Sequence, residues 1–367
     1  MIRYDNDERI VMTLDAGGTN FDFTAIQANQ EIVEPVTLPS HGDNLEKSLN
    51  SIREGFTTIK RQLKKDPVAI SFAFPGPSDF PAGIILDLLN LPGYRGGVPL
   101  ASMLEEQFGI PTFINNDGDL FVYGEAIAGF LPYINQKLAE YNNPKRFRNL
   151  FGITLGTGFG AGIVHDGQLY LGDNSSAAEI WLLRSKLHPD VNAEEGASIR
   201  GVQRVYMQLA VTGVSEMPTP KDIYEIATGN KEGNREAALR AYHDFGTVVG
   251  DALANAITLL DTVIVIGGGL AGAHSLFLQH AVDEMNNPLL NMDGTPAQRL
   301  EMKAYNLEDP KQLEEFLIGE TKTISIPATT KTITFDPLKR TGVGLTRLGT
   351  SKAVAIGAYA FALNRLG

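Results

Sequence analysis

Two turns rich in glycine and threonine are the clearest chemical features of this 367-residue sequence. LDAGGTN spans residues 14–20 and LGTGFGAG spans residues 155–162, and each follows an apolar stretch typical of a buried strand. Glycines let backbone N–H groups face a phosphate without obstruction, and a threonine hydroxyl adds a donor. A tight hairpin turn explains one such segment equally well. Two of them in sequence order predict a nucleotide held from both halves of the chain.

The phosphate contacts expected from these turns come from eight residues: Gly17, Gly18, Thr19, Asn20, Gly156, Thr157, Gly158 and Gly160. Asp15 stands at the end of the first predicted strand, where its carboxylate can hold the water shell of a Mg ion. The turns and Asp15 together indicate a nucleotide with its Mg ion.

A third glycine run, IGGGLAG at residues 266–272, follows the apolar stretch TVIVI. Its G-x-G-x-x-G spacing matches a dinucleotide-binding fingerprint, so a dinucleotide-dependent enzyme is an alternative. That fingerprint needs a second parallel strand that ends in an acidic residue about 20 residues further on. The sequence there, DEMNNPLLNMDG, has Pro and Asn where apolar strand residues are required. The dinucleotide interpretation is therefore disfavoured.

The polar segment INNDGD, residues 114–119, lies where a predicted strand gives way to a predicted helix. A general base for a sugar hydroxyl must be a carboxylate within hydrogen-bonding reach of that hydroxyl and held by a rigid element, which a strand end provides. The competing explanation is that Asn116 or Asp117 only caps the helix. The two phosphate turns favour the catalytic explanation.

Three more carboxylates, Glu179, Glu194 and Glu195, lie in a polar middle section. A carboxylate accepts hydrogen bonds from two hydroxyls, which suits a sugar, but exposed glutamates are also common on any protein surface. The six histidines show no metal-ligand spacing. The local sequence does not decide whether the three glutamates bind a sugar or only lie on the solvated surface.

The elements that must position these residues alternate between strands and helices. Residues 10–14 and 21–26 predict a strand hairpin, and residues 150–155 and 161–165 repeat that pattern, which suggests a duplicated domain. Residues 285–345 are polar and irregular, so we expect a surface insertion there.

The final helix, residues 350–366, is expected to start with Thr350 or Ser351 as its N-cap. Its small residues, Ala353, Gly357 and Ala358, form a face suited to close packing.

Composition limits the classes of function. The 43% of hydrophobic residues suffice for two lobes, and the net charge of −12 opposes binding to nucleic acid or an anionic membrane. No apolar run approaches the roughly 20 residues that span a bilayer. The chain has no cysteine, which excludes disulfides and thiolate metal sites and fits the reducing cytoplasm.

Together these segments resemble the ROK family (repressor, open reading frame, kinase) of sugar kinases and sugar-responsive repressors, within the actin/hexokinase superfamily. LDAGGTN and LGTGFGAGIVHDGQLYLG look like the family's two phosphate motifs, and IVIGGGLAG looks like its adenosine motif. FPGPSD and NLPGY resemble its substrate-side loop, and NDGDLFVYGE resembles its catalytic segment. The resemblance covers most of the chain.

The resemblance implies a role for each matching residue. Asp117 is the implied general base, and sugar contacts are implied for Asn90, Asn116, Asp117, Glu179 and Glu194. Gly267, Gly268 and Gly269 are the implied adenosine contacts.

The sequence departs from the family pattern in one region. Family members carry E-x-G-H and then a cysteine-rich zinc loop ending in C-x-E, with Ser four residues after that Glu. Here Glu179 is followed by Ile-Trp-Leu, so Leu182 replaces the histidine and every zinc cysteine is missing. Glu194 keeps the spacing to Ser198, so we prefer it to Glu195 as the sugar ligand. We expect a zinc-free loop held by packing around Trp181 and Leu182.

The expected fold is therefore α/β: a two-lobed, duplicated actin/hexokinase (ribonuclease H-like) fold with an ATP cleft between the lobes. The N-terminal lobe is expected at residues 8–129, completed by residues 350–367, and the C-terminal lobe at 130–349. The expected reaction is Mg-ATP-dependent phosphorylation of a hexose, glucose or an N-acetylhexosamine, at its 6-hydroxyl.

We also expect a cytoplasmic homodimer. A non-catalytic sugar sensor of the same family is the second alternative, although only ~14 residues precede Asp15, too few for a helix-turn-helix module.

Overall fold

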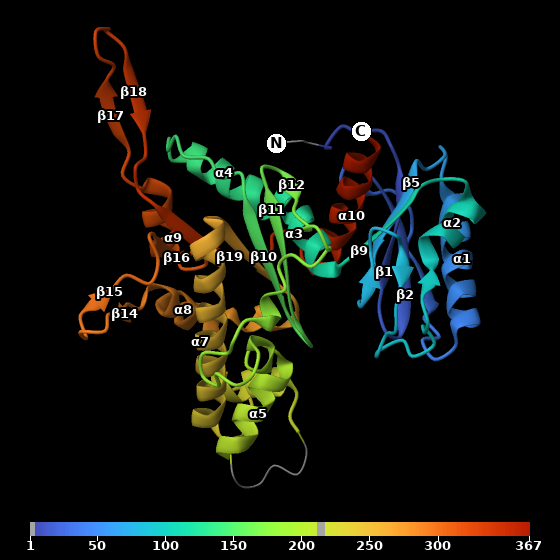
Figure 1. The fold of residues 1–367 in the computed structure, drawn as a ribbon, viewed down its shortest axis with the longest axis horizontal. Coiled ribbons are helices and arrows are strands. Elements are labelled where there is room, and N and C mark those ends of the chain that lie inside the picture. The colour runs from blue at the N-terminus through green and yellow to red at the C-terminus, as the bar shows by residue number, and fades with distance from the viewer. Residues whose placement is uncertain (1–3, 211–216) are drawn as a thin grey trace. The chain divides into compact units, whose positions relative to one another are not determined.

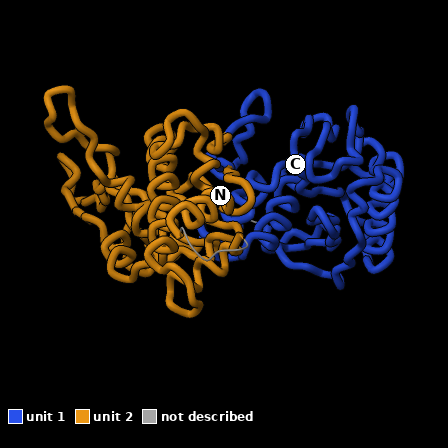
Figure 2. The backbone as a smooth tube through the Cα atoms, turned by 90° about the horizontal axis from the view of Figure 1, so that it is seen from below, with its two compact units in different colours: residues 1–132, 162–177, 347–367 blue, residues 133–161, 178–346 orange. Residues whose placement is uncertain are grey.

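The computed structural model describes residues 4–210 and 217–367. The chain forms two compact units, shown in Figure 2. Unit 1 contains residues 1–132, 162–177 and 347–367, and unit 2 contains residues 133–161 and 178–346.

A six-stranded sheet forms the centre of unit 1, in the order β3-β2-β1-β5-β9, with β4 paired to β2 (Figure 1). β1 pairs antiparallel with β2 and parallel with β5, and β5 pairs parallel with β9. The strands are β1 (Val11–Ala16), β2 (Asn20–Gln27), β3 (Gln30–Glu31), β4 (Val36–Pro39), β5 (Ala69–Ala73) and β9 (Thr112–Asn115).

The side chains of β5 explain how helices cover both faces of this sheet. Ile70 and Phe72 point into an apolar core that also contains residues of α1 (Leu45–Gln62) and α2 (Leu100–Phe108). The alternate residues Ala69, Ser71 and Ala73 are small, so α10 (Thr350–Leu366) can pack closely on the opposite face. Figure 1 shows α10 and α1 on opposite sides of the sheet.

Helix α3 (Asp117–Ile127) packs along α10 through the predicted small-residue face. A Cβ on Gly357 would lie 1.8 Å from the backbone oxygen of Leu120, and a Cβ on Gly124 would lie 1.9 Å from that of Ala353. Glycine is therefore required at both positions. The predicted N-cap of α10 is wrong: Gly349 is the cap, with no side-chain hydrogen bond, because Thr350 already has helical geometry.

A small three-stranded sheet carries the expected substrate-side loop of unit 1. Its strands are β6 (Ser78–Asp79), β7 (Ile84–Ile85) and β8 (Val98–Pro99).

A second six-stranded sheet has the order β12-β11-β10-β13-β19-β16. β10, β13, β19 and β16 run parallel, and β11 pairs antiparallel with β12. The strands are β10 (Leu150–Leu155), β11 (Phe159–His165), β12 (Gln168–Leu169), β13 (Val263–Gly267), β16 (Lys303–Asn306) and β19 (Arg340–Leu345). A hairpin with a short third strand, followed by parallel strands, occurs in both large sheets, which agrees with the expected duplication.

Three helices of unit 2, α5, α6 and α8, pack against the long helix α7, and α9 packs against β16. The helices of unit 2 are α4 (Phe130–Glu140), which begins in unit 1, α5 (Ile199–Ala210), α6 (Pro220–Thr228), α7 (Arg235–Leu260), α8 (His274–Asn286) and α9 (Pro310–Ile318). Three short 3₁₀ helices are η1 (Ile180–Leu182), η2 (Ala193–Glu195) and η3 (Gly269–Ala273).

The expectation of one surface insertion at residues 285–345 is corrected by the structure. β16 and β19 are strands of the large sheet, and α9 packs against β16. Only two hairpins are peripheral: β14 (Leu289–Leu290) with β15 (Pro296–Ala297), and β17 (Lys322–Ser325) with β18 (Thr332–Phe335). Proline and polar residues in these hairpins obscured the two core strands beside them.

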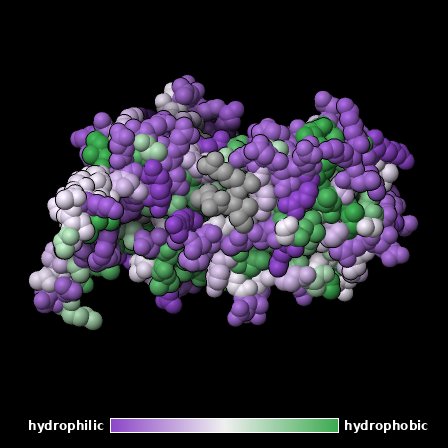
Figure 3. Space-filling view, turned by 90° about the horizontal axis from the view of Figure 1, so that it is seen from above, coloured by the Kyte–Doolittle hydropathy of each residue, from purple (hydrophilic) through white to green (hydrophobic). Residues whose placement is uncertain are grey.

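The face of the molecule shown in Figure 3 is predominantly polar. On the face shown in Figure 3, apolar side chains form small separate patches among hydrophilic ones. Within the described residues, no helix has the length and apolar character needed to cross a membrane.

Candidate active site

The carboxyl ends of three parallel strands meet at one edge of the unit 1 sheet. Asp15 of β1 is in register with Ala73 of β5, and Ala73 is in register with Asn115 of β9. This register brings Asp15 to the same edge as the Asn116–Asp117 segment, and ligands of open α/β sheets bind at such edges.

Asp117 is the first residue of α3, and Asn116 is the N-cap of that helix. The backbone nitrogen of Gly118 donates to Asn116 Oδ1 at 2.7 Å and to Asp117 Oδ1 at 2.8 Å. Asp117 is accessible to solvent, but the surrounding protein displaces much of the water around its carboxylate and so raises its pKa. Hydrogen bonds from the N–H groups of Gly118 and Asp117 oppose that rise. The result is a fixed carboxylate with increased proton affinity.

The capping explanation therefore holds for Asn116 without excluding a second role. Capping uses Oδ1, so a sugar contact from Asn116 would come from its amide nitrogen.

Asp15 is electrostatically coupled to its neighbours. Partial desolvation raises the pKa of Asp15, a hydrogen bond from the Ser351 hydroxyl lowers it, and the carboxylates of Asp22 and Asp117 raise it again. Oxygen ligands and an excess of negative charge suit a hard divalent cation. Among the described residues, no group of three or more Asp, Glu or His side chains could enclose a metal ion. Asp15 therefore fits a Mg ion that keeps most of its water and phosphate ligands.

The first phosphate turn is held from one side. Ser40 donates from Oγ to the Gly18 oxygen at 2.6 Å and from its backbone nitrogen to the Thr19 oxygen at 2.9 Å. The Gly18 C=O and the Thr19 N–H belong to one trans peptide unit, in which these two groups point in opposite directions. Because the Gly18 oxygen accepts from Ser40, the Thr19 N–H points away from Ser40. Gly17, Thr19 and Asn20 are exposed, and a Cβ on Gly18 would meet nothing within 4 Å. An anion can therefore approach this backbone.

The second phosphate turn joins β10 to β11 in unit 2. Gly156 donates from its nitrogen to the Gly158 oxygen at 3.0 Å, and a Cβ on Gly160 would lie 2.6 Å from Thr154 Oγ1. Thr157 is exposed at the tip of the turn. The turn is therefore compact, and its threonine is open to solvent.

The third glycine run lies at the same sheet edge as the second turn. Gly267 of β13 is in register with Thr154 of β10. Gly268 has a φ of 87°, and a Cβ there would lie 2.4 Å from the Leu155 oxygen, so only glycine fits. Gly269 begins η3. Gly267–Gly269 therefore lie at the end of β13, the strand beside the one that carries the second turn.

Glu194 lies directly against the second turn. The backbone nitrogen of Phe159 donates to Glu194 Oε2 at 3.0 Å, and Arg200 Nη2 donates to Glu194 Oε1 at 3.0 Å. About a fifth of the side chain, 22%, is exposed. Glu194 thus contacts a phosphate motif as well as an α5 arginine.

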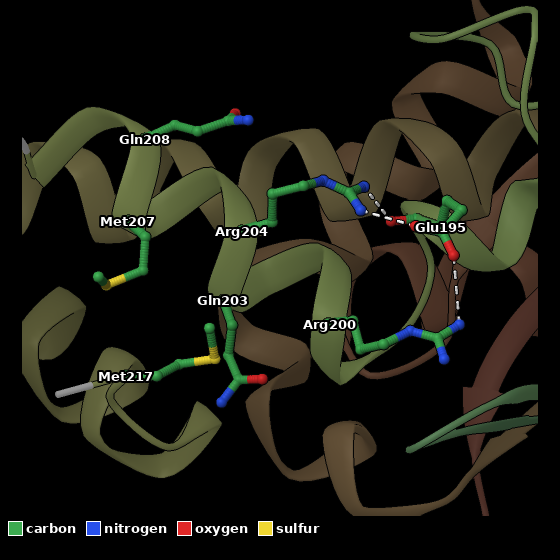
Figure 4. A pocket seen from close by; sticks show the side chains of 7 residues that line it. All are labelled: Glu195, Arg200, Gln203, Arg204, Met207, Gln208 and Met217. Carbon is green, nitrogen blue, oxygen red and sulfur yellow. Dashed lines mark hydrogen bonds and ion pairs between the residues drawn. The ribbon is translucent and has the colours of Figure 1, made fainter.

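Glu195 has different partners. It pairs with Arg200 at 3.3 Å and with Arg204 at 2.7 Å, as Figure 4 shows. These side chains line one side of a cavity of about 800 Å³ along α5, together with Gln203 and Met207. The structure thereby separates the two neighbouring glutamates, since only Glu194 bonds to the turn.

Comparison with known proteins identifies the family. The family model described as ROK family matches residues 11–311. This chain belongs to the ROK family. An N-acetyl-D-glucosamine kinase from Vibrio parahaemolyticus is 25% identical to the ROK chain over 274 residues, covering 72% of this chain and 85% of the relative. A glucokinase from Halalkalibacterium halodurans is 26% identical over 301 residues, covering 74% and 84%.

One solved structure is more similar to this ROK chain than the two kinases above are. The crystal structure of a glucokinase from Parabacteroides distasonis has 51% sequence identity and a TM-score of 0.89, and the match covers 99% of both chains. A ROK hexokinase from Thermus thermophilus, 19% identical with a TM-score of 0.65 over 97% of this chain and 99% of that chain, shares the fold. The expected actin/hexokinase fold is confirmed, and the dinucleotide-binding alternative is not supported.

The loop that replaces the ROK zinc site is held differently from the expectation. Leu182 is 58% exposed, so it does not pack the loop closed. Backbone bonds close it instead, from Ala193 N to Leu183 O at 2.6 Å and from Ser185 N to Val191 O at 3.0 Å. An ion pair between Lys186 and Glu284 ties the loop to α8. The expected packing was therefore half wrong: only Trp181 is partly buried.

Two predicted sugar contacts, Glu179 and Asn90, have no hydrogen bond to the other candidate site residues within the described part of the chain. Glu179 precedes η1 and accepts a hydrogen bond from Trp181 Nε1. Asn90 is exposed between buried Leu88 and Leu91, and in the described chain no hydrogen bond joins Asn90 to Asp117. The structure groups Asp15, the first turn and Asn116–Asp117 in unit 1, and the second turn with Glu194 in unit 2.

Three residues that support the site carry no signal in the sequence: Ser40 behind the first turn, Ser351 beside Asp15, and Arg200 on Glu194. Their partners are 22, 336 and 6 positions away. None of these separations is the three or four residues at which side chains meet on one helix, so no local pattern suggested the pairs.

Proposed function

We propose that this chain transfers the γ-phosphoryl group of ATP to the 6-hydroxyl of a hexose, glucose or N-acetylglucosamine, with Asp117 as general base. The coarser assignment is firm: the chain is a sugar kinase of the ROK family, given 51% identity to a glucokinase over 99% of both chains. The observation that carries the finer proposal is the fixed carboxylate of Asp117, with its raised pKa, at the carboxyl edge of the sheet.

Asp117 would accept the proton of the 6-hydroxyl as that oxygen attacks the γ-phosphorus. The bond from phosphorus to the ADP oxygen breaks, and ADP leaves with that electron pair. A base with increased proton affinity is better matched to a hydroxyl donor than an ordinary aspartate. The hydrogen bond from Gly118 N to Asp117 Oδ1 keeps the carboxylate oriented. Asn116, as the N-cap of α3, fixes the start of the helix that carries Asp117.

Asp15 is proposed to hold Mg through water. Mg neutralises charge on the transferring phosphoryl group when bound. The partial desolvation of Asp15 and its repulsion from Asp117 and Asp22 favour a cation there. The Ser351 hydroxyl orients the Asp15 carboxylate.

The nucleotide is proposed to use all three glycine segments. The exposed turn at residues 17–20 and the exposed residues Thr157 and Gly158 of the second turn suit the phosphates, and residues 267–269 suit the adenosine. ATP use is supported by the related glucokinases and by a ROK glucokinase from Streptomyces griseus solved with glucose and AMPPNP.

The sugar is proposed to contact Asn90, Asn116, Glu179 and Glu194. Each Glu accepts hydroxyl hydrogen bonds, and a buried acceptor left unpaired penalises a sugar that lacks the matching hydroxyl. We place the enzyme in the cytoplasm as a homodimer, which light scattering of the purified protein would check.

The decisive experiment is a coupled ADP-release assay of the purified protein with Mg-ATP. The panel is glucose, N-acetylglucosamine, mannose, N-acetylmannosamine, fructose and the deoxyglucoses, with the phosphate position assigned by NMR. Activity with none of these sugars, or a phosphate on another carbon, contradicts the substrate assignment. Sugar binding without turnover would instead favour the regulator function, which a 26% identical xylose repressor from Caldicellulosiruptor bescii keeps under consideration.

A further inference from the structure

The second phosphate turn and the segment carrying Glu194 are fastened together by two hydrogen bonds. One joins Phe159 N to Glu194 Oε2 at 3.0 Å, and the other joins Ile199 N to the Gly156 oxygen at 2.9 Å. A Cβ on Gly158 would lie 3.0 Å from Glu194 Oε2, so the carboxylate also lies against the middle of the turn. Both ends of the turn therefore contact the segment that contains the proposed sugar ligand.

The bond to Phe159 matters because it uses a donor of the phosphate motif. Backbone N–H groups of a glycine turn bind phosphate oxygens, and each N–H makes one strong hydrogen bond. A phosphate oxygen at Phe159 N must therefore displace Glu194 Oε2. Two anions at one amide would also repel each other. Glu194 and a nucleotide phosphate thus compete for the same donor.

Arg200 limits where the carboxylate can move. It donates to Glu194 Oε1, the oxygen that does not contact the turn. Loss of the Phe159 bond therefore leaves Glu194 anchored through Oε1, with Oε2 able to accept from another donor. A sugar hydroxyl is such a donor.

We propose that Glu194 couples sugar binding to phosphate binding: a sugar hydroxyl takes Oε2, which releases the Phe159 N–H for the nucleotide. This inference rests on the proposed function because it needs Glu194 to contact the sugar. It adds a second role to that residue. By linkage, nucleotide binding strengthens sugar binding by the same factor. When no sugar is bound, Glu194 keeps the Phe159 N–H, so productive phosphate binding is disfavoured. ATP hydrolysis without a sugar acceptor is then disfavoured as well.

The test is the affinity for Mg-AMPPNP, measured by isothermal titration calorimetry on the full chain. In the wild type, saturating glucose or N-acetylglucosamine is expected to tighten AMPPNP binding roughly tenfold, the worth of one hydrogen bond to a charged group. In Glu194→Ala, AMPPNP is expected to bind roughly tenfold tighter than to the wild type without any sugar, and sugar should add nothing. A residue that only binds sugar would leave the sugar-free affinity unchanged.

Glu195→Ala is the matched control. It removes the neighbouring carboxylate, which pairs with the same Arg200, but Glu195 makes no bond to the turn. Both variants remove one negative charge, so a general electrostatic effect would appear in both. Sugar-free AMPPNP affinity should stay within about twofold of the wild type in Glu195→Ala, and circular dichroism checks the fold of each variant.

Equal or weaker sugar-free AMPPNP binding in Glu194→Ala overturns the inference, as does equal tightening in Glu195→Ala. These affinities are measured without sugar, so they do not depend on the hexose assignment. An active hexokinase with unchanged AMPPNP affinity in Glu194→Ala defeats the coupling alone. A wild type that phosphorylates no hexose defeats the proposed function instead.

Discussion

The buried carboxylate of Glu125, near the end of α3, accepts a hydrogen bond from the backbone nitrogen of Leu348 at 3.1 Å. It also accepts from Phe130 N at 2.6 Å and from Arg347 N at 3.1 Å. One acid therefore joins the helix that begins with Asp117 to the segment that enters α10. Ser351, which bonds to Asp15, lies three residues further on. Glu125 thus supports both proposed active-site carboxylates of unit 1.

Glu125→Gln should destabilise the protein by about 2–3 kcal/mol, because the amide retains one acceptor and turns a donor toward backbone N–H groups. Calorimetric unfolding measures the loss. Glu140→Gln is the control, since Glu140 makes an exposed, solvent-screened pair with Lys137 and its loss should leave the stability nearly unchanged. Equal unfolding temperatures for the two variants would show that the Glu125 bonds contribute little.

Gly357→Ala should destabilise the protein by about 3 kcal/mol or more, because the new methyl would lie 1.8 Å from the Leu120 oxygen. Backbone on both sides must move to admit it. Gly272→Ala is the control, since a Cβ there meets nothing within 4 Å. Similar unfolding temperatures for both variants would mean that α3 and α10 separate easily.

The sequence predicted the strands and turns that carry the phosphate motifs, since their apolar runs and glycines are local signals. It did not reveal that Glu125 bonds to Leu348, because 223 positions separate them. It also misjudged β19, where Arg340 and Thr341 look polar although both are buried, in register with Lys303 and Ala304 of β16. Contacts that depend on tertiary packing of polar groups leave no periodic signal. The proposed assignments of Asp117 and Glu194 came from motif spacing, whereas the bond from Phe159 to Glu194 required the structure.

Asp117→Asn should lower kcat by ~10²–10⁴ while sugar binding persists, since a positioned base contributes that much. It should also raise the unfolding temperature at neutral pH. The folded protein favours protonated Asp117, so this residue's contribution to stability is present below its ordinary pKa of 3.8 and is lost as pH rises through the raised folded value. Asparagine avoids that loss. Unchanged turnover would remove Asp117 from the mechanism.

The pH dependence of kcat/KM should show an acid limb that rises as Asp117 loses its proton. Because the pKa of Asp117 is raised, the midpoint should lie above 3.8. The limb should be missing from the residual activity of Asp117→Asn. A limb retained in that variant would assign the titration to another group.

The purified enzyme should contain no stoichiometric zinc, because the chain has no cysteine and Leu182 stands where the family has histidine. Elemental analysis measures this, and chelation followed by added Mg should leave the KM for sugar unchanged. The Lys186–Glu284 pair, with Glu284 almost buried, should hold the loop between Glu179 and Glu194 in place of a metal. Lys186→Met should therefore raise the KM for sugar severalfold with kcat retained, whereas Lys339→Met, which breaks an exposed pair with Glu301, should not. One zinc per chain whose removal abolishes activity would contradict the first expectation, and equal KM values in both variants would contradict the second.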